Sequence, residues 1–150
     1  MPVPAPNLNP PFNTVRLSHV EFGVTDLARS RAFYVDTLGL QVTDETADTI
    51  WLRALEERGH HCLVLRKSDR AEARDLGFKA WDEDHLDRAA AFFAAKGLPV
   101  DWVERPFQGR TFRTRDPQGI PLELYARMDR LPPIHQQYAL YKGVKPLRID

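Results

Sequence analysis

The chain has 150 residues, of which 43% are hydrophobic and 28% are charged, the proportions of an ordinary soluble globular domain. Its 21 basic and 21 acidic residues give a formal net charge of zero, which provides no electrostatic reason to bind nucleic acid or a membrane surface. No apolar run reaches the length of about 20 residues that a membrane-spanning helix needs, and the single cysteine, Cys62, excludes an internal disulfide and favours a cytoplasmic location.

The N-terminal stretch, residues 1–14, is rich in proline. Proline fixes φ and lacks the backbone N–H that a helix needs. The stretch also lacks the basic and apolar regions of a signal peptide. We therefore expect an extended arm ahead of a domain that covers residues 15–128.

The first half of that domain is predicted to contain a strand, a helix and three further strands. The first strand covers residues 16–24. Asp26 is expected to cap a helix over residues 27–38, and Gly39 to end it. Stretches rich in Val, Ile, Leu and Trp place the remaining strands at residues 41–43, 49–55 and 61–66.

The second half repeats this order, because residues 82–100 resemble residues 24–42. Both stretches have an acidic N-cap, a helical period with an aromatic pair, and the motif Gly-Leu-x-Val. The second copy predicts a helix at residues 85–96 and a turn at residues 116–119. Its strands are placed at residues 76–81, 101–103, 111–115 and 120–126.

Strand alternation indicates which side chains meet the helices. In the first strand Val20 and Phe22 lie on one face, while His19 and Glu21 lie on the other. Each helix has to bury an apolar stripe on the sheet, so we expect the polar faces, which include Glu123, to line a concavity. The side chains expected to be buried are Val20, Phe22, Leu27, Phe33, Tyr34, Leu122 and Leu124.

Two segments, HVEFGVTDLARSRAFYVDTLGL from His19 and DPQGIPLELY from Asp116, resemble the vicinal oxygen chelate superfamily of glyoxalases, bleomycin resistance proteins and dioxygenases. The resemblance covers residues 15–125 and implies an α+β fold in which two βαβββ modules form a cupped mixed sheet backed by helices. Within the superfamily, WLRALEERGHHCLVLR and HQQYALYKGVKPLRID are most similar to the N-terminal domain of extradiol ring-cleaving dioxygenases, in particular the homoprotocatechuate 2,3-dioxygenases.

This resemblance implies a parent enzyme that opens a catecholic ring with O₂ on Fe(II) or Mn(II) held in a C-terminal catalytic domain. Residues 129–150 are then expected to be a crossing linker and the start of that domain. The stretch LRID at residues 147–150 repeats the build of VRLS at residues 15–18 and stops where a ligating histidine would stand. The implied partners are the C-terminal domain and further copies in a homo-oligomer, and the chain alone is expected to be inactive and to bind no cofactor.

In the superfamily, the metal is held by a histidine in the first module and by a ligand and a glutamate in the second. His19 and Glu123 match the first and third positions, but the offset of 58 residues between the modules places Gly77 at the second. A catalytic metal site normally has at least three protein ligands. We therefore interpret His19 and Glu123 as vestiges and expect neither a metal site nor catalytic residues. A site completed from elsewhere, by Glu21 for example, and a His19 that is only hydrogen-bonded remain alternatives.

Other titratable residues give weaker signals. His60 and His61 are adjacent on a predicted strand, so they are expected to point to opposite faces and not to chelate one ion together, although either is a candidate single ligand. Cys62 is expected to be a small buried hydrophobe, and His85 a solvated helix residue. Solvated or salt-bridged roles without chemistry are expected for Arg110, Arg113, Arg115 and His135.

Two other functions compete with a non-catalytic dioxygenase domain. One is a stand-alone glyoxalase-like metalloenzyme that uses His19 and Glu123 across a dimer. The other is a metal-free binding module of the bleomycin-resistance type that holds an aromatic ligand in the cleft. Residues 132–150 favour the dioxygenase domain, because only a further domain gives that tail a purpose.

Overall fold

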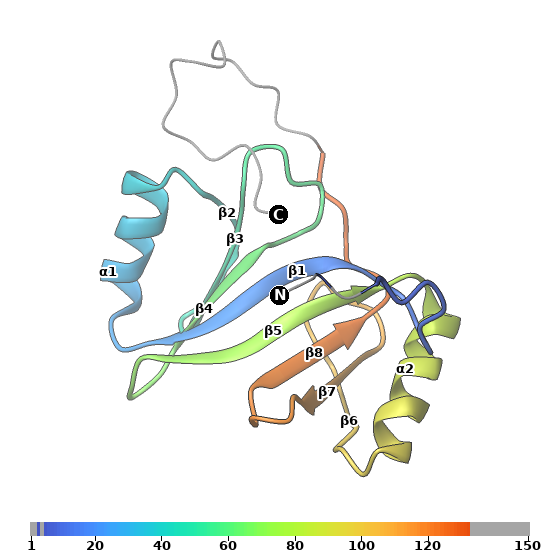
Figure 1. Cartoon of the computed structure of the whole chain (residues 1–150). Helices are drawn as coiled ribbons and strands as arrows, with labels where there is room; N and C mark the ends of the chain where they lie inside the picture. The colour runs from blue at the N-terminus through green and yellow to red at the C-terminus, as the bar shows by residue number, and fades with distance from the viewer. Residues whose placement is uncertain (1–2, 4, 133–150) are drawn as a thin grey trace.

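The computed structural model describes residue 3 and residues 5–132 of the chain. Within this part, eight strands form one mixed sheet in the order β2-β3-β4-β1-β5-β8-β7-β6, with α-helices packed against it (Figure 1). Neither α-helix of the described part is long and apolar enough to cross a bilayer. The expectations for residues 133–150, which include His135 and the start of a further domain, lie outside the described residues.

The first module begins with the expected strand and helix. Asp26 caps the helix by accepting a hydrogen bond from the backbone N–H of Arg29 at 2.9 Å. After Ala32 the helix widens into a π-helical turn, η1, and it ends at Gly39, whose φ is 77°. The elements are β1 (Thr14–Val24), α1 (Leu27–Ala32), η1 (Phe33–Thr37), β2 (Gln41–Glu45), β3 (Thr49–Arg53) and β4 (Leu63–Lys67).

The second module repeats this order. Asp82 caps its helix by accepting the backbone N–H of His85 at 2.9 Å. The expected turn before the last strand is confirmed by a hydrogen bond of 2.9 Å from the Gly119 N–H to the carbonyl of Asp116. The elements are β5 (Glu72–Ala80), α2 (Glu83–Ala95), β6 (Asp101–Val103), β7 (Thr111–Arg115) and β8 (Pro121–Tyr125).

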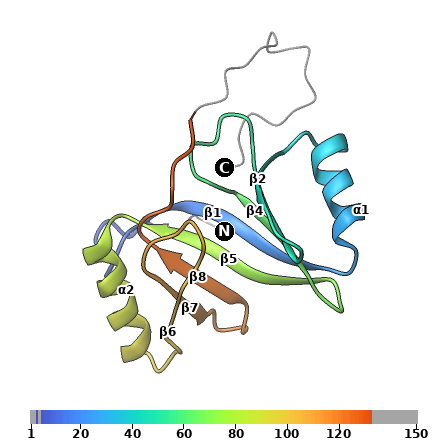
Figure 2. The same cartoon turned by 180° about the vertical axis from the view of Figure 1, so that it is seen from behind.

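The two modules join through their first strands. β1 pairs antiparallel with β5, parallel with β4 on its other side, and β5 pairs parallel with β8. β5 begins at Glu72 rather than near residue 76 because it pairs along almost the whole of β1. The continuous sheet curls, so that the half with β2–β4 and the half with β6–β8 form a cup (Figures 1 and 2).

Two hydrophobic cores lie between the helices and the apolar faces of the strands, as expected. The first packs around Leu52 and Leu65, and the second around Leu86, Phe112 and Leu124. Leu124 is buried as expected. The remaining side chains expected in the core, except one, are partly buried against these clusters: Val20, Phe22, Leu27, Tyr34 and Leu122.

Phe33 is the exception, and its expected burial is wrong: 51% of its surface is exposed. Successive residues lie about 100° apart around a helix, so two neighbours cannot both face the sheet. Tyr34 stands two turns after Leu27 on the inner side and packs against the first core, which leaves Phe33 outside.

We therefore expect Phe33→Ala to lower the free energy of unfolding by less than about 1 kcal/mol. Leu52→Ala, at a site with 0% exposure, is expected to cost about 2–5 kcal/mol because it opens a cavity in the first core. Urea denaturation of both variants tests the assignment. Equal losses would contradict the outward position of Phe33.

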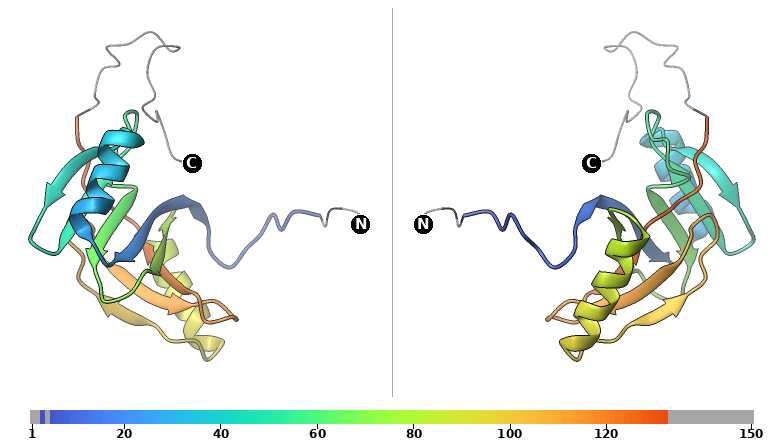
Figure 3. Two further views of the ribbon diagram at one scale, coloured as in Figure 1. Left: turned by 90° about the vertical axis from the view of Figure 1, so that its left-hand side faces the viewer. Right: turned by 90° about the vertical axis from the view of Figure 1, so that its right-hand side faces the viewer.

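Residues 5–13 extend away from the sheet as an arm (Figure 3). The arm is attached at its inner end, where the ring of Phe12 packs 5.7 Å from the ring centroids of both Phe92 and Phe93 on α2. Asn13 adds hydrogen bonds to the second module, one of which comes from the backbone N–H of Trp81 at 3.1 Å. The arm therefore starts from a fixed point on α2.

Candidate functional site

The concave face of the sheet is lined by buried polar side chains. His19 on β1 stands opposite Gly77 on β5, and Gly77 stands opposite Glu123 on β8, so the three residues lie side by side across the sheet. His19 is 4% exposed and Glu123 is 1% exposed. In the next row of the same face, Glu21 is opposite Asp75, and both are buried.

The imidazole ring of His19 lies directly over Gly77. A Cβ atom at position 77 would be 2.6 Å from Nε2 of His19 and closer still to Cε1 and Nδ1. Non-bonded heavy atoms do not approach this closely, so any side chain at position 77 and the observed ring of His19 exclude one another. Gly77, at the second position of the superfamily's ligand set, therefore offers no ligand atom, and the ring of His19, at the first position, covers it.

Both carboxylate oxygens of Glu123 are already bonded. Its Oε1 lies 3.3 Å from Nε2 of His19 and accepts a hydrogen bond of 2.8 Å from the side-chain amide of Gln108. Its Oε2 accepts a hydrogen bond of 2.6 Å from Nε of Arg105. Burial by itself raises the pKa of Glu123, but the hydrogen bond from His19, the positive charge of Arg105 and the Gln108 amide outweigh it and lower the pKa to about 2.

Arginines also neutralise the other buried acids of this face. Asp75 accepts hydrogen bonds from Nε of Arg113 at 2.9 Å and from Nη2 of Arg105 at 3.3 Å. Burial nevertheless raises the pKa of Asp75 above its ordinary value. Glu21 accepts a hydrogen bond of 2.8 Å from Nε of Arg66. The buried acids of the concave face are thus paired with arginines, and Arg105 is shared by two of them.

His60 and His61 lie against this network, and the expectation that they point to opposite faces is wrong. They precede β4 and are not part of a regular strand, so alternation does not apply to them. Their Nδ1 atoms are 3.2 Å apart, and the ring of His61 meets the ring of His19 edge-on with centroids 5.0 Å apart. Burial, assisted by the neighbouring histidines, lowers the pKa of His61 to about 3, which keeps it neutral.

The loop between β6 and β7 brings Arg105 and Gln108 into the cup. Phe107, which lies between them in sequence, has a φ of 66°, a conformation that is uncommon outside glycine. Its ring stacks on His60, with centroids 3.7 Å apart, and meets Trp51 edge-on. The loop is therefore held in the cup by packing as well as by its polar side chains.

The residues of this face do not fit a metal ion. A site with two histidines and one carboxylate needs three free donor groups that converge on one point. Gly77 supplies no donor group, and the ring of His19 covers it. Both carboxylate oxygens of Glu123 already accept hydrogen bonds from nitrogen donors. The guanidinium of Arg105 also places a positive charge beside the carboxylate that a metal would use.

Next to this network the concave face holds a pocket of about 470 Å³. Arg66, Arg74, Arg105 and Arg113 line it together with as many acidic residues, and Trp51 supplies an aromatic wall. A pocket with so many ion pairs offers little apolar surface to an aromatic ring. It does not favour the aromatic-ligand binder.

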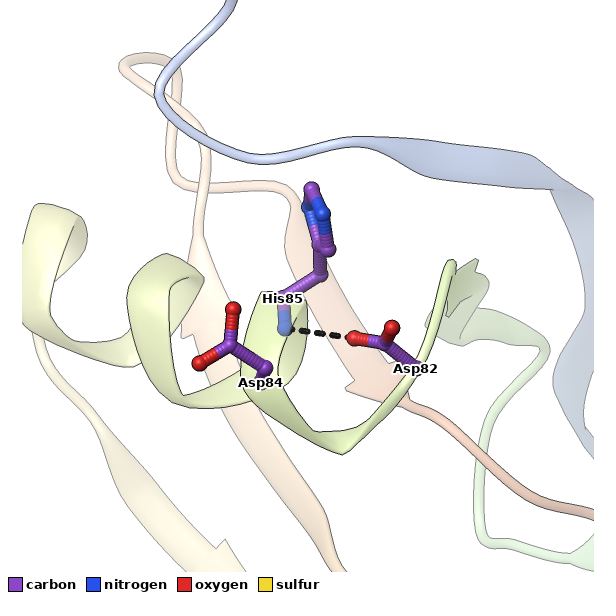
Figure 4. A group of neighbouring side chains, drawn as sticks. All are labelled: Asp82, Asp84 and His85. Atoms are coloured by element: carbon purple, nitrogen blue, oxygen red, sulfur yellow. Dashed lines mark hydrogen bonds between the residues drawn. The ribbon is translucent and has the colours of Figure 1, made fainter.

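Asp82, Asp84 and His85 form a group of possible metal ligands outside the cup (Figure 4). The geometry is explained by a helix cap, because the carboxylate of Asp82 accepts the backbone N–H of His85. The ring of His85 points away from both acids, and its Nδ1 accepts the backbone N–H of Asn13 at 2.9 Å. His85 lies at the surface with intermediate exposure, and its contact with Asn13 fastens the arm.

Because His85 holds the arm rather than a metal, we expect His85→Ala to destabilise the domain by about 0.5–1.5 kcal/mol, the value of one hydrogen bond. Asp84→Ala, which removes a possible ligand that makes no such contact, is the matched control and is expected to have a smaller effect. Thermal denaturation with and without ZnCl₂ measures both. Stabilisation of the wild-type protein by zinc that is lost in both variants would contradict this assignment.

The three arginines singled out around β7 do not share one face. Arg110 precedes the strand, binds Asp87 at 2.6 Å and lies over the ring of Trp102 on the outside of the domain. Arg113 points into the cup, and Arg115 donates to the carbonyl of Gly119. Arg110 and Arg113 therefore have the expected salt-bridged roles, although they lie on different faces.

Cys62 is a free thiol that is 2% exposed, as expected for a small buried hydrophobe. Burial raises its pKa to about 11, so the thiol stays protonated. It is therefore not a thiolate nucleophile at neutral pH.

Known proteins match this sequence and fold. Residues 16–124 match the family model of the Glyoxalase/Bleomycin resistance protein/Dioxygenase superfamily. The manganese-dependent 2,3-dihydroxybiphenyl 1,2-dioxygenase of Geobacillus genomosp. 3 is 29% identical over 90% of this chain and 46% of its own length. The crystal structure of homoprotocatechuate 2,3-dioxygenase from Arthrobacter globiformis superposes with a TM-score of 0.87, at 36% identity over 99% of this chain and 47% of that chain. The uncharacterized protein YaeR of Escherichia coli is 30% identical over 73% of this chain and 95% of its own length.

Proposed function

The chain belongs to the Glyoxalase/Bleomycin resistance protein/Dioxygenase superfamily, and on that premise we propose that it is the non-catalytic N-terminal domain of an extradiol dioxygenase. The parent enzyme would use O₂ to open a catecholic ring of the homoprotocatechuate type. The chain spans 46% of the manganese-dependent dioxygenase of Geobacillus and 47% of the homoprotocatechuate 2,3-dioxygenase of Arthrobacter, which is consistent with one domain of a longer protein. Residues 129–150 would then lead into a C-terminal domain that holds Fe(II) or Mn(II).

The observation that supports the non-catalytic role is that the three positions expected to bind a metal ion offer no free set of ligands. Gly77 has no donor group, the ring of His19 occupies the space above it, and Glu123 is bonded on both oxygens. A domain in this state supports a neighbouring catalytic domain by packing rather than by chemistry. Assembly into a homo-oligomer and a cytoplasmic location complete the proposal.

We expect the 150-residue chain alone to bind no stoichiometric iron, manganese or zinc and to consume no O₂ with 3,4-dihydroxyphenylacetate. The protein made from the full reading frame around it is expected to do both. Elemental analysis and an oxygen electrode measure the two forms side by side. Tight metal binding by the chain alone that disappears in His19→Ala would contradict the proposal, as would a reading frame that ends at Asp150.

One observation favours a second candidate. The match to YaeR covers 95% of that protein, so relatives with only this domain exist. A stand-alone protein of this kind would be a glyoxalase-like metalloenzyme or a binder. The length of the reading frame separates the two candidates, because a stand-alone protein needs only this domain, whereas the dioxygenase continues into a second domain.

A further inference from the structure

A second pocket, of about 710 Å³, opens at the end of the sheet where β1 begins. Its floor is a row of residues across three strands: Arg16 on β1 is opposite Lys79 on β5, and Lys79 is opposite Tyr125 on β8. The loop between β3 and β4 and the segment after β8 form its walls. Pockets that bind small molecules have volumes of about 300–1,000 Å³, so this one is large enough for such a ligand.

The lining of this pocket carries more positive than negative charge, although the chain as a whole has a net charge of zero. Two acidic residues, Glu56 and Glu57, line it. Glu57 is buried, and its Oε1 already accepts a hydrogen bond of 2.8 Å from Nη2 of Arg16. The basic residues of the lining are Arg16, Arg58, Lys79, Arg127 and Arg130. Positive charge is therefore concentrated at this end of the sheet.

Most of these basic groups have no acidic partner in the described part of the chain. Neither Arg58, Lys79 nor Arg130 forms an ion pair with a described residue, and Arg127 lies 3.6 Å from Glu83, which is outside the pocket. Like charges that face one pocket repel one another. A bound anion would remove this repulsion, and the positive potential of the pocket would attract it.

The backbone holds Arg58 and Arg130 at the pocket before any ligand arrives. Gly59 and Arg130 form an isolated antiparallel β-bridge between the two walls. The backbone N–H of Leu131 donates to the carbonyl of Arg58 at 3.0 Å. Binding therefore needs no ordering of these wall segments, which favours affinity.

We propose that this pocket binds a small organic anion with two or more phosphate or carboxylate groups. Guanidinium groups pair with both kinds of anion through two parallel hydrogen bonds, and the ammonium group of Lys79 adds a point charge. Val15, Ala126 and Met128 also line the pocket and provide apolar contacts for the body of the ligand. The proposal does not depend on the dioxygenase assignment, because it concerns only groups within this domain.

The test is titration of the 150-residue chain with inorganic pyrophosphate and with citrate, at constant ionic strength, by isothermal titration calorimetry and differential scanning fluorimetry. One anion is expected to bind per chain and to raise the Tm by roughly 5–10 °C at a hundredfold excess over Kd. The affinity is expected to fall as NaCl is added, because salt screens the charges. The tighter of the two probes identifies phosphate or carboxylate as the preferred group.

Two double variants locate the bound anion. Arg58→Gln with Arg130→Gln leaves the backbone contacts between the walls in place and is expected to weaken binding at least about tenfold. Arg29→Gln with Arg88→Gln removes the same charge from exposed positions on the two helices and is expected to bind as the wild type does. Lys79→Gln is expected to weaken binding as well and serves if the first double variant does not fold. No binding of either anion by wild-type protein, or equal affinities of the two double variants, would overturn the proposal.

Discussion

Gly77→Ala is expected to lower the free energy of unfolding by about 2–6 kcal/mol, a large effect for one methyl group. Gly77 has an ordinary strand backbone, so conformational strain is not the cause. The methyl group would occupy the space of the His19 ring and force it to move. Overpacking of a buried site costs about 1–3 kcal/mol, and breaking the hydrogen bond between His19 and Glu123 adds about 1–3 kcal/mol because buried polar atoms are left unsatisfied.

A double-mutant cycle with His19→Ala shows whether the ring is the cause. Once the imidazole is absent, the added methyl group has room, so Gly77→Ala is expected to cost less than about 1 kcal/mol in the His19→Ala background. Chemical denaturation of the four proteins gives the coupling energy. Additive losses would mean that the ring does not occupy the space above position 77 in solution.

The sequence alone was sufficient to predict that His19, Gly77 and Glu123 lie at corresponding positions on one face of the sheet. The internal repeat sets the offset between modules, and strand alternation places all three residues on one face, because both signals are periodic and local. The structure brings the three side by side across β1, β5 and β8. The periodic signals did not show that the ring of His19 lies over Gly77, because that depends on the choice of rotamer.

Arg105 and Gln108 were not singled out from the sequence. They lie in an irregular loop without a motif, and their contact with Glu123 depends on the path that the loop takes across the cup. Periodicity also fails at His60 and His61, which precede the regular part of β4. A hint was the presence of Glu21 and Glu123 on the polar strand faces, because acidic side chains require positively charged partners if they are buried.

The decrease in the free energy of unfolding at acidic pH is expected to depend on His61. Its pKa of about 3 in the folded state is below the ordinary value near 6.5 of an unfolded chain, so the unfolded state takes up a proton first as the pH falls. The stability that neutral His61 provides is therefore complete above about pH 6.5 and is lost as the pH falls toward 3. The loss amounts to about 2 kcal/mol between pH 6.5 and 5, where carboxylates contribute little.

Replacement of this residue isolates its share of that slope. His61→Gln keeps polar atoms in the pocket but does not titrate, so its free energy of unfolding is expected to change less between pH 6.5 and 5 than that of the wild-type protein. The groups that face the ring are His19, His60, Gln108 and Glu123. Burial also lowers the pKa of His60, which leaves a smaller slope of the same sign in the variant. Urea denaturation at half-unit pH intervals measures both proteins, and parallel curves for wild type and His61→Gln would mean that His61 titrates normally in the folded domain.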